Sequence, residues 1–242
     1  MITLIGTGHV FDLSNALLAI FDEKEPEVLC IELDKQRYNT IMIKKSNPEV
    51  YKNARADLPF IYKRLAKFQE NMADEYGVEV GNEMLTAINY AQSHQLPLEF
   101  IDMNAQQLFI KMWKSMKFIE KFRLLLSGFA GIFLTKKRVE KEIENLQDEF
   151  DVYLEEISKK FPTIKKVLID DRNNYMVNRI KIINENFQKI VVLIGDGHVP
   201  GISELLKKEN IEFETIRLQD LRSYHQESDD KSSAHFSINY KP

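Results

Sequence analysis

The sequence predicts an α/β fold in which a mixed, largely parallel central sheet is flanked by helices and carries a long helical insertion. Three observations lead to this prediction. Apolar runs typical of strands alternate with helical periodicity near both ends of the chain, which is the pattern of parallel sheets covered by helices. A strand followed by Gly-x-Gly-His and a helix occurs twice, at residues 6–9 and at residues 195–198. Between the two copies, mixed charge and apolar stripes continue with few turn signals, as in solvated helices.

The first segments alternate between strand and helix. Ile2 to Ile5 is a short apolar run that ends at a glycine, and Leu13 to Phe21 has apolar residues at helical spacing. Glu27 to Leu33 favours a buried strand. A second helix is predicted to begin near Asp34, which is expected to cap it because a carboxylate there accepts hydrogen bonds from free backbone N–H groups.

The middle of the chain is predicted to be mostly helical. Leu58 to Ala73 and Gly81 to Gln95 favour two helices, and Leu98 to Met103 favours a third strand with Asp102 near its end. The stretch from Phe109 to about Asn186 has few turn signals. We therefore expect a helical insertion over about residues 105–186.

The alternation of strand and helix then returns. Lys189 to Ile194 favours a strand, Val199 to Lys208 a helix, and Phe213 to Arg217 a further strand. The tail is polar over about residues 224–233 and is expected to be flexible, and His235 to Tyr240 is consistent with an edge strand. Since strands lie on both sides of the insertion, we expect residues 1–242 to form one domain whose two ends share a sheet.

Composition limits the class of protein. The chain has 242 residues, of which 44% are hydrophobic and 29% charged, which suits a globular domain. The net charge of −4 gives no indication of nucleic-acid binding. There is no signal-peptide pattern and no run of the roughly 18 apolar residues that a transmembrane segment needs, so a cytoplasmic protein is expected. Cys30 is the only cysteine, which excludes an internal disulfide, and it is expected to pack as a small apolar residue.

One apolar stretch, Phe118 to Leu134, allows two interpretations. It suits a buried helical hairpin that turns near Gly128 and Gly131. Its amphipathic beginning is also consistent with a surface that contacts a membrane or a second subunit. From this surface we predict a homodimer formed through the helical insertion.

The two Gly-x-Gly-His motifs are expected to form one functional site. Ligands of open α/β sheets bind beyond the carboxyl ends of the strands, and both His9 and His198 fall there. Each histidine lies near the start of a helix, whose positive end favours the neutral imidazole that binds a metal or accepts a proton. Glycines let the backbone turn and approach a ligand closely. The turn glycines are Gly6, Gly8, Gly195 and Gly197.

Acidic residues at other strand ends extend this predicted site. Glu32 lies within an apolar strand, where an unpaired carboxylate is costly, so it is expected to be paired or to bind a metal. Asp102 has the same position at the third strand. Two histidines and a carboxylate suit an open site for a divalent ion, Mn, Co or Zn, with room for a water nucleophile.

Two further hypotheses stay open from the residues alone. A strand, Gly6-x-Gly8 and a helix resemble a dinucleotide fingerprint. Glu32 would be its acidic residue, but Phe11 stands where its third glycine is expected. The group Asp170-Asp171-Arg172 is either a solvated charge cluster on a helix or a group in which the Arg172 guanidinium binds an anionic part of a substrate.

In four segments the sequence resembles the TraB/PrgY/Tiki proteins. In chain order these segments are similar to a first GxxH motif with a nearby serine, an ELD…R strand, a G-x-E-M…A…D stretch and a second GxxH motif followed by Pro-Gly. The resemblance covers the chain to about residue 217. The segments are Ile5 to Val10 with Ser14, Val28 to Asp34 with Arg37, Gly81 to Ala87 followed by Leu98 to Asp102, and Val191 to Gly201.

The resemblance implies an EreA/ChaN-like α/β fold. Members of the Tiki branch are metal-dependent peptidases that use both GxxH motifs and a glutamate. This implies catalytic and metal-binding roles for His9, His198 and Glu32. Relatives of the pheromone-shutdown type have no established chemistry, and many relatives carry C-terminal transmembrane helices for which this sequence has no suitable run.

The sequence departs from the family pattern at two places. Asp171-Arg172 stands where the family often has Glu-Arg, which keeps the charge and shortens the reach. Asp102-Met103-Asn104 stands where Asp-Arg-Asp is expected, so a substrate contact at that point loses two charges.

We therefore predict a metal-dependent hydrolase of peptides, in which Glu32 ligates the ion or acts as general base. The alternative is a non-catalytic protein that binds or sequesters a peptide or pheromone, and a further alternative is a dinucleotide-binding protein. The residues expected to orient the site or contact substrate are Asp102, Arg172, Asp171 and Arg37.

Overall fold

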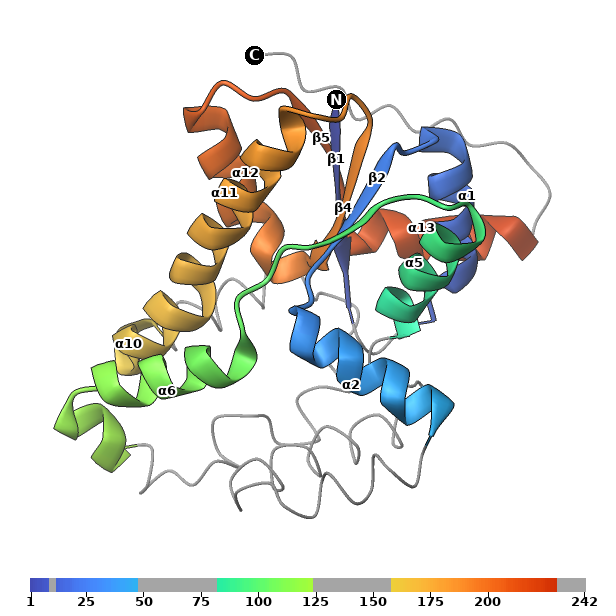
Figure 1. Ribbon diagram of the computed structural model, residues 1–242. Helices are drawn as coiled ribbons and strands as arrows, with labels where there is room; N and C mark the ends of the chain where they lie inside the picture. The colour runs from blue at the N-terminus through green and yellow to red at the C-terminus, as the bar shows by residue number, and fades with distance from the viewer. Residues whose placement is uncertain (9–11, 48–81, 124–157, 230–242) are drawn as a thin grey trace. The chain divides into compact units, whose positions relative to one another are not determined.

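The computed structural model describes residues 1–8, 12–47, 82–123 and 158–229, and the chain divides into two compact units (Figure 1). Unit 1 comprises Met1–Asp102 together with Met176–Pro242, and unit 2 comprises Met103–Tyr175. The boundary between the units falls within one helix, α11 (Asp171–Asn184). The prediction of one domain over the whole chain stays a prediction.

Unit 1 is built on a five-stranded sheet with the order β3-β2-β4-β1-β5. All pairs of neighbouring strands are parallel, which confirms the predicted α/β class with a largely parallel sheet. The first strand lies between the two strands from the far end of the chain, so both ends share the sheet as expected. The strands are β1 (Ile2–Thr7), β2 (Val28–Ile31), β3 (Leu98–Phe100), β4 (Ile190–Gly195) and β5 (Phe213–Ile216).

Helices cover both faces of the sheet, because β1, β2 and β4 are apolar on both faces. On one face lie α1 (Ser14–Lys24), α5 (Asn82–Ser93) and α13 (Leu218–Asp229), as Figure 1 shows. On the other face lie α12 (Val199–Lys208) and the part of α11 that belongs to unit 1. A further helix, α2 (Lys35–Ser46), follows β2 and contributes Tyr38, Ile41 and Met42 to the edge of the first core.

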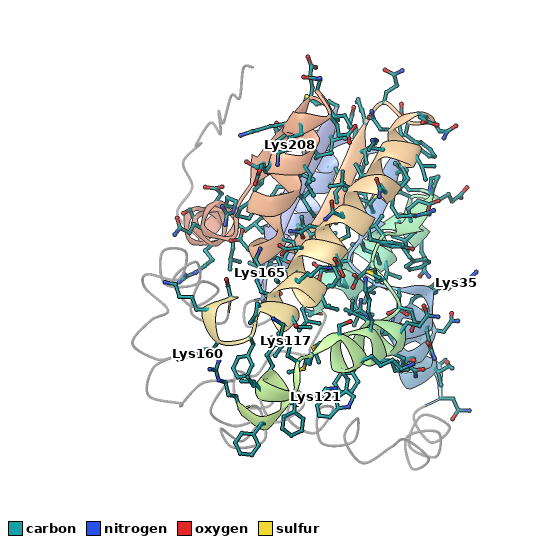
Figure 2. The ribbon with its side chains drawn as sticks, turned by 90° about the vertical axis from the view of Figure 1, so that its left-hand side faces the viewer. Lys35, Lys117, Lys121, Lys160, Lys165 and Lys208 are labelled. Atoms are coloured by element: carbon teal, nitrogen blue, oxygen red, sulfur yellow. The ribbon has the colours of Figure 1, made fainter. Side chains whose placement is uncertain are left out.

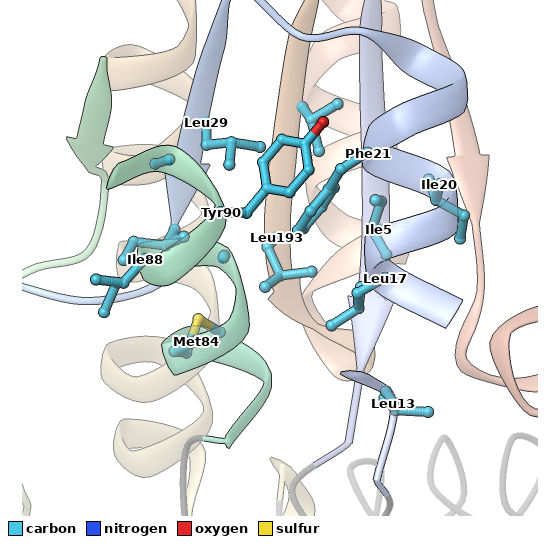
Figure 3. Close-up of a cluster of buried hydrophobic side chains, with 14 of the residues drawn as sticks. Ile5, Leu13, Leu17, Ile20, Phe21, Leu29, Met84, Ile88, Tyr90 and Leu193 are labelled. Atoms are coloured by element: carbon cyan, nitrogen blue, oxygen red, sulfur yellow. The ribbon is translucent and has the colours of Figure 1, made fainter. Parts of the chain in front are cut away.

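The core between α1, α5 and the sheet is shown in Figure 3. Phe21 of α1 and Tyr90 of α5 pack with ring centroids 5.0 Å apart and tilted planes. The Tyr90 hydroxyl donates to Asp22 Oδ1 at 2.9 Å, so its polar end is satisfied at the rim of the core. This packing holds the second halves of α1 and α5 together over the sheet.

Unit 2 is helical in its described part. It contains α6 (Ala105–Ser115), a helical segment over residues 118–123, α10 (Pro162–Lys165), a single π-helical turn (Lys166–Asp170) and the first turn of α11. A small core of its own joins these segments. It consists of Leu108, Met112, Met116, Phe161 and Val167.

Several sequence expectations fall outside the described residues. These are the helix from Leu58 to Ala73, the hairpin turn near Gly128 and Gly131, and the edge strand from His235 to Tyr240. Helix α13 continues to Asp229, into the polar segment over about residues 224–233, whose flexibility stays a prediction. Leu221 is fully buried, and it anchors this helix on the core before the polar stretch begins.

Within the part of the chain that the structure describes, no helix is both long enough and apolar enough to cross a bilayer.

Candidate functional site

The carboxyl ends of all five strands lie at one edge of the sheet, because all strands are parallel. Gly6 is in register with Ile194, and Thr7 with Gly195, so the two Gly-x-Gly-His motifs follow neighbouring strands with an offset of one residue. The offset places the backbone of Thr7 beside the first glycine of the second motif. Both motifs therefore begin within one residue of each other along this edge, as the sequence predicts.

The central feature of this edge is the pair of Glu32 and His198. Glu32 directly follows β2, and its backbone N–H extends the ladder by donating to Leu193 O at 3.0 Å. One carboxylate oxygen, Oε2, accepts the N–H of Gly195 at 2.6 Å. The other oxygen, Oε1, lies 3.6 Å from His198 Nε2, and both side chains are largely buried. Two residues that are far apart in sequence thus place an imidazole nitrogen and a carboxylate oxygen together.

The spacing of this pair fits two ligands of one metal ion. A hydrogen bond between an imidazole nitrogen and a carboxylate oxygen is ordinarily about 2.7–2.9 Å long, which is shorter than the 3.6 Å observed. Two ligands about 2.1 Å from a tetrahedral metal are about 3.4 Å apart. Among the described residues no group of three or more His, Cys, Asp or Glu is close enough to hold a metal. The third predicted ligand, His9, lies outside the described residues, as does Phe11.

His198 is positioned by a short turn between β4 and α12. Asp196, Gly197 and His198 form one turn of 3-10 helix, and His198 is the residue that precedes the first turn of α12. Its side chain is 7% exposed. The imidazole therefore lies at the start of a helix, as the sequence predicts, and it faces the carboxylate at the end of the neighbouring strand β2.

Asp196, between the two glycines of the second motif, forms a brace of hydrogen bonds at this edge of the sheet. Its carboxylate accepts from Arg217 Nε at 2.8 Å and Nη2 at 2.6 Å, and from the backbone N–H of Leu218 at 3.0 Å. These bonds tie the end of β4 to the start of α13. No sequence pattern marks Asp196 or Arg217, so this brace was not predicted.

Gly6 is required for this brace. A Cβ atom at residue 6 would lie 2.2 Å from Asp196 Oδ1, far closer than any side-chain contact allows. At Gly195 the same construction gives 3.4 Å to Glu32 Oε2, an ordinary contact. The first glycines of the two motifs therefore serve different purposes: one makes room for a carboxylate, and the other donates its N–H to one.

Asp34, Arg37 and Asp102 form a second brace on the other side of Glu32. Asp34 Oδ1 accepts the backbone N–H groups of Gln36 and Arg37 at 2.9 and 3.0 Å, which confirms the predicted helix cap. Arg37 Nε donates to Asp34 Oδ2 at 2.7 Å, and its Nη2 donates to Asp102 Oδ2. Arg37 thus joins the start of α2 to the segment after β3. In this arrangement the charges of Arg37 and Asp102 are paired within the protein. Their contact with a substrate stays a prediction.

Polar side chains also gather where α1 and α5 begin. Ser14 Oγ accepts from Asn82 Nδ2 at 3.2 Å and lies 3.2 Å from Thr86 Oγ1. Glu83, in the first turn of α5, is 2% exposed. The positive end of a helix favours a carboxylate in its first turn and offsets part of the cost of burying it, and the G-x-E-M resemblance contained the signal for this residue. We add Glu83 to the residues of interest at this edge.

Two predicted site residues, Asp171 and Arg172, belong to unit 2. Asp171 forms ion pairs with Lys111 at 2.7 Å and with Lys166 at 3.0 Å. The hydrogen bond from Lys111 is the main reason why the pKa of Asp171 lies below its ordinary value. Arg172 Nη1 donates to Leu168 O at 3.3 Å. Both side chains have partners within unit 2, and their roles toward a substrate stay predictions.

Comparison with known proteins assigns the family. The model of the TraB/PrgY/gumN family matches residues 1–215, so the chain belongs to this family. The uncharacterized protein MJ1365 of Methanocaldococcus jannaschii is similar, with 32% identity over 216 residues, which are 86% of this chain and 53% of that protein. The chain thus spans about half the length of the curated relative it matches. The family resemblance inferred from the four motifs is confirmed, whereas the peptide ligand, the homodimer and the cellular compartment stay predictions.

Proposed function

We propose that the carboxyl edge of the sheet binds a divalent metal ion and hydrolyses peptides there. The observation that carries this proposal is the pair of His198 Nε2 and Glu32 Oε1, which lie 3.6 Å apart at the ends of neighbouring strands. His198 and Glu32 would hold the ion together with His9 from the first motif. When bound, a divalent ion of the Mn, Co or Zn type supplies Lewis acidity, which makes water a nucleophile near neutral pH.

The surrounding residues would keep this pair in a fixed geometry. The N–H of Gly195 holds one oxygen of Glu32 and leaves the other directed toward His198. The Asp196–Arg217 brace fixes the turn that carries His198. A carboxylate held in this way suits a ligand, or a general base that takes a proton from water. Rigid support of this kind is what a catalytic geometry requires.

Metal content tests the binding part of the proposal. Protein purified without chelator is expected to retain about one equivalent of a divalent metal, since a buried His and Glu provide two of the ligands. His198→Ala and Glu32→Gln should each lose most of it. The matched controls are His94→Ala, at the exposed end of α5, and Glu23→Gln, an exposed residue of α1. Metal content in His198→Ala equal to that of the unaltered protein would refute the metal assignment.

Peptide cleavage tests the catalytic part. A peptide library incubated with the protein and added Mn²⁺, Co²⁺ or Zn²⁺ should yield products, and Glu32→Gln should abolish them while Glu23→Gln does not. Saturable peptide binding that survives Glu32→Gln, without any turnover, supports the non-catalytic alternative instead. The dinucleotide alternative has its own measurement: an unchanged melting temperature at millimolar NAD would exclude it.

A further inference from the structure

Helix 118–123 of unit 2 exposes large apolar side chains. Phe118 is 82% exposed, Ile119 62% and Phe122 54%. At about 100° per residue, these three positions share one face of the helix. None of them belongs to the small core of unit 2. An apolar helical face that is directed outward in this way is characteristic of an interaction surface.

Glu120 fixes the orientation of this helix. Its side chain is on the opposite face and is buried, and it accepts from the backbone N–H of Lys117 at 2.9 Å. It also accepts from the backbone N–H of Thr163 at 2.9 Å and from the Thr163 hydroxyl at 2.7 Å. The acidic residue is therefore held inward against the start of α10. As a result, rotation that would bury the phenylalanines breaks three hydrogen bonds.

Basic side chains surround the apolar face. Figure 2 shows Lys117, Lys121, Lys160 and Lys165 around helix 118–123 and α10. Lys121 Nζ also lies 5.4 Å from the ring centroid of the partly exposed Trp113. The described part of unit 2 contains ten Lys or Arg against three Asp or Glu, although the whole chain has a net charge of −4. Positive charge is thus concentrated in the described part of unit 2, which exposes the apolar face.

Among the described residues of unit 2, the three acidic side chains do not neutralise this surface. Glu120 is buried, Asp170 pairs with Lys165, and Asp171 pairs with Lys111 and Lys166. Three lysines close in sequence to the apolar face form no ion pair among the described residues. They are Lys114, Lys117 and Lys121.

This distribution of charge decides which partner fits. In a symmetric dimer through this face, each copy would bring the same lysines against those of the other copy, which is unfavourable. Phenylalanine and isoleucine beside lysine and tryptophan are the composition of helices that lie in the headgroup region of anionic membranes. We infer that helix 118–123 docks on an anionic lipid surface, with Phe118, Ile119 and Phe122 inserted and the surrounding lysines at the headgroups.

Vesicle binding tests this inference with the full chain. The protein should sediment with vesicles of phosphatidylcholine and phosphatidylglycerol, bind vesicles of phosphatidylcholine alone much more weakly, and dissociate as salt is raised. Replacing Phe118, Ile119 and Phe122 together by Ser should weaken binding to the mixed vesicles about tenfold or more. The charge-reversal variant Lys114→Glu/Lys117→Glu/Lys121→Glu should weaken it to a similar degree and should leave the weak binding to neutral vesicles unchanged.

Matched controls come from unit 1. Ile43 and Ile182 are 42% and 53% exposed, so Ile43→Ser/Ile182→Ser removes exposed apolar surface elsewhere. Lys35→Glu/Lys208→Glu reverses the charge of two lysines outside unit 2 (Figure 2). Both controls should bind the mixed vesicles as the unaltered protein does. Circular dichroism and thermal unfolding verify that each variant is folded.

Three outcomes would overturn the inference. One is equal binding to neutral and anionic vesicles, and another is full binding by the folded triple serine variant. The third is the absence of vesicle binding, combined with dimers in light scattering or with RNA complexes, either of which the serine variant loses. Dimers would assign the face to a second copy of the chain, and RNA complexes would assign it to a nucleic acid.

Discussion

Gly6 of the first strand lies directly against the carboxylate of Asp196, a residue of the second Gly-x-Gly-His motif. A Cβ atom at residue 6 would be 2.2 Å from Asp196 Oδ1 and 3.0 Å from Cγ2 of Val199. The carboxylate cannot move away without cost, since Arg217 and the N–H of Leu218 hold both of its oxygens. The two motifs are thus coupled by packing as well as by position.

Gly6→Ala should therefore destabilise the protein. The added methyl group forces Asp196 out of its bonds to Arg217, and overpacking of this kind costs about 1–3 kcal/mol. Urea unfolding measures the loss. Gly195→Ala is the matched control, because its Cβ would make only an ordinary contact of 3.4 Å with Glu32. Equal stability of the two variants would contradict the packing argument.

Arg217→Met should destabilise unit 1 by about 1.5–3 kcal/mol, because it removes two charge-assisted hydrogen bonds from a largely buried carboxylate. Lys208→Met provides the comparison. Lys208 forms an exposed pair with Glu204 at 2.6 Å, and exposed pairs at this helical spacing contribute about 0.3–0.5 kcal/mol. A loss of stability in Arg217→Met as small as that in Lys208→Met would show that the hydrogen bonds between Arg217 and Asp196 contribute little to the stability of the fold.

Glu120 should make the stability of unit 2 depend on pH. Burial raises the pKa of Glu120, but hydrogen bonds from Thr163 and from the backbone N–H of Lys117 outweigh it, so the pKa lies below its ordinary value of 4.5. A carboxyl group whose pKa is lowered by folding stabilises the fold above pH 4.5, and this contribution is lost as the pH falls through the lowered pKa.

Glu120→Gln tests this expectation through the pH dependence of unfolding. At neutral pH the variant should lose about 1.5–3 kcal/mol, since a neutral amide accepts the three hydrogen bonds more weakly. Below the lowered pKa the two proteins should converge in stability. A difference that stays constant from neutral pH down to about pH 3 would contradict the assignment of the effect to the charge.

Cys30 should be unreactive in the folded protein. Its side chain is fully buried in the core between β2 and the helices α11 and α12, and burial raises the pKa of the thiol far above its ordinary value. A thiol reagent should therefore label no cysteine under native conditions and one per chain in denaturant. Rapid labelling of native protein would indicate that this part of the sheet opens.

The strands β2 and β4 were predictable because their sequences are almost continuously apolar. A strand that is buried on both faces lacks polar alternation, and KIVVLI and EVLCIEL show this directly. The position of Glu32 at a strand end and of Asp34 at a helix start could also be read locally, since each depends only on its immediate neighbours. The pairing of Glu32 with the second motif followed from the common edge of a parallel sheet.

The order of the strands and the Asp196–Arg217 brace were not predictable in this way. The insertion of β4 between β1 and β2 depends on which apolar faces meet in three dimensions, which local periodicity does not encode. Asp196 and Arg217 are 21 residues apart and belong to different elements, so no helical or strand spacing relates them. The extent of α13 was missed for a similar reason, since the buried Leu221 anchors a segment whose composition suggests a loop.

The strand order also determines when this sheet can form during synthesis. β1 has β4 and β5 as its only neighbours in the sheet, and the first of these begins at Ile190. A ribosome that adds about 5–20 residues per second needs roughly 10–40 s to reach that point after making β1. During this time the apolar strand has none of its final partners. Sheet formation is thus a late and long-range event, which predicts slow folding and a nascent chain that depends on protection from aggregation.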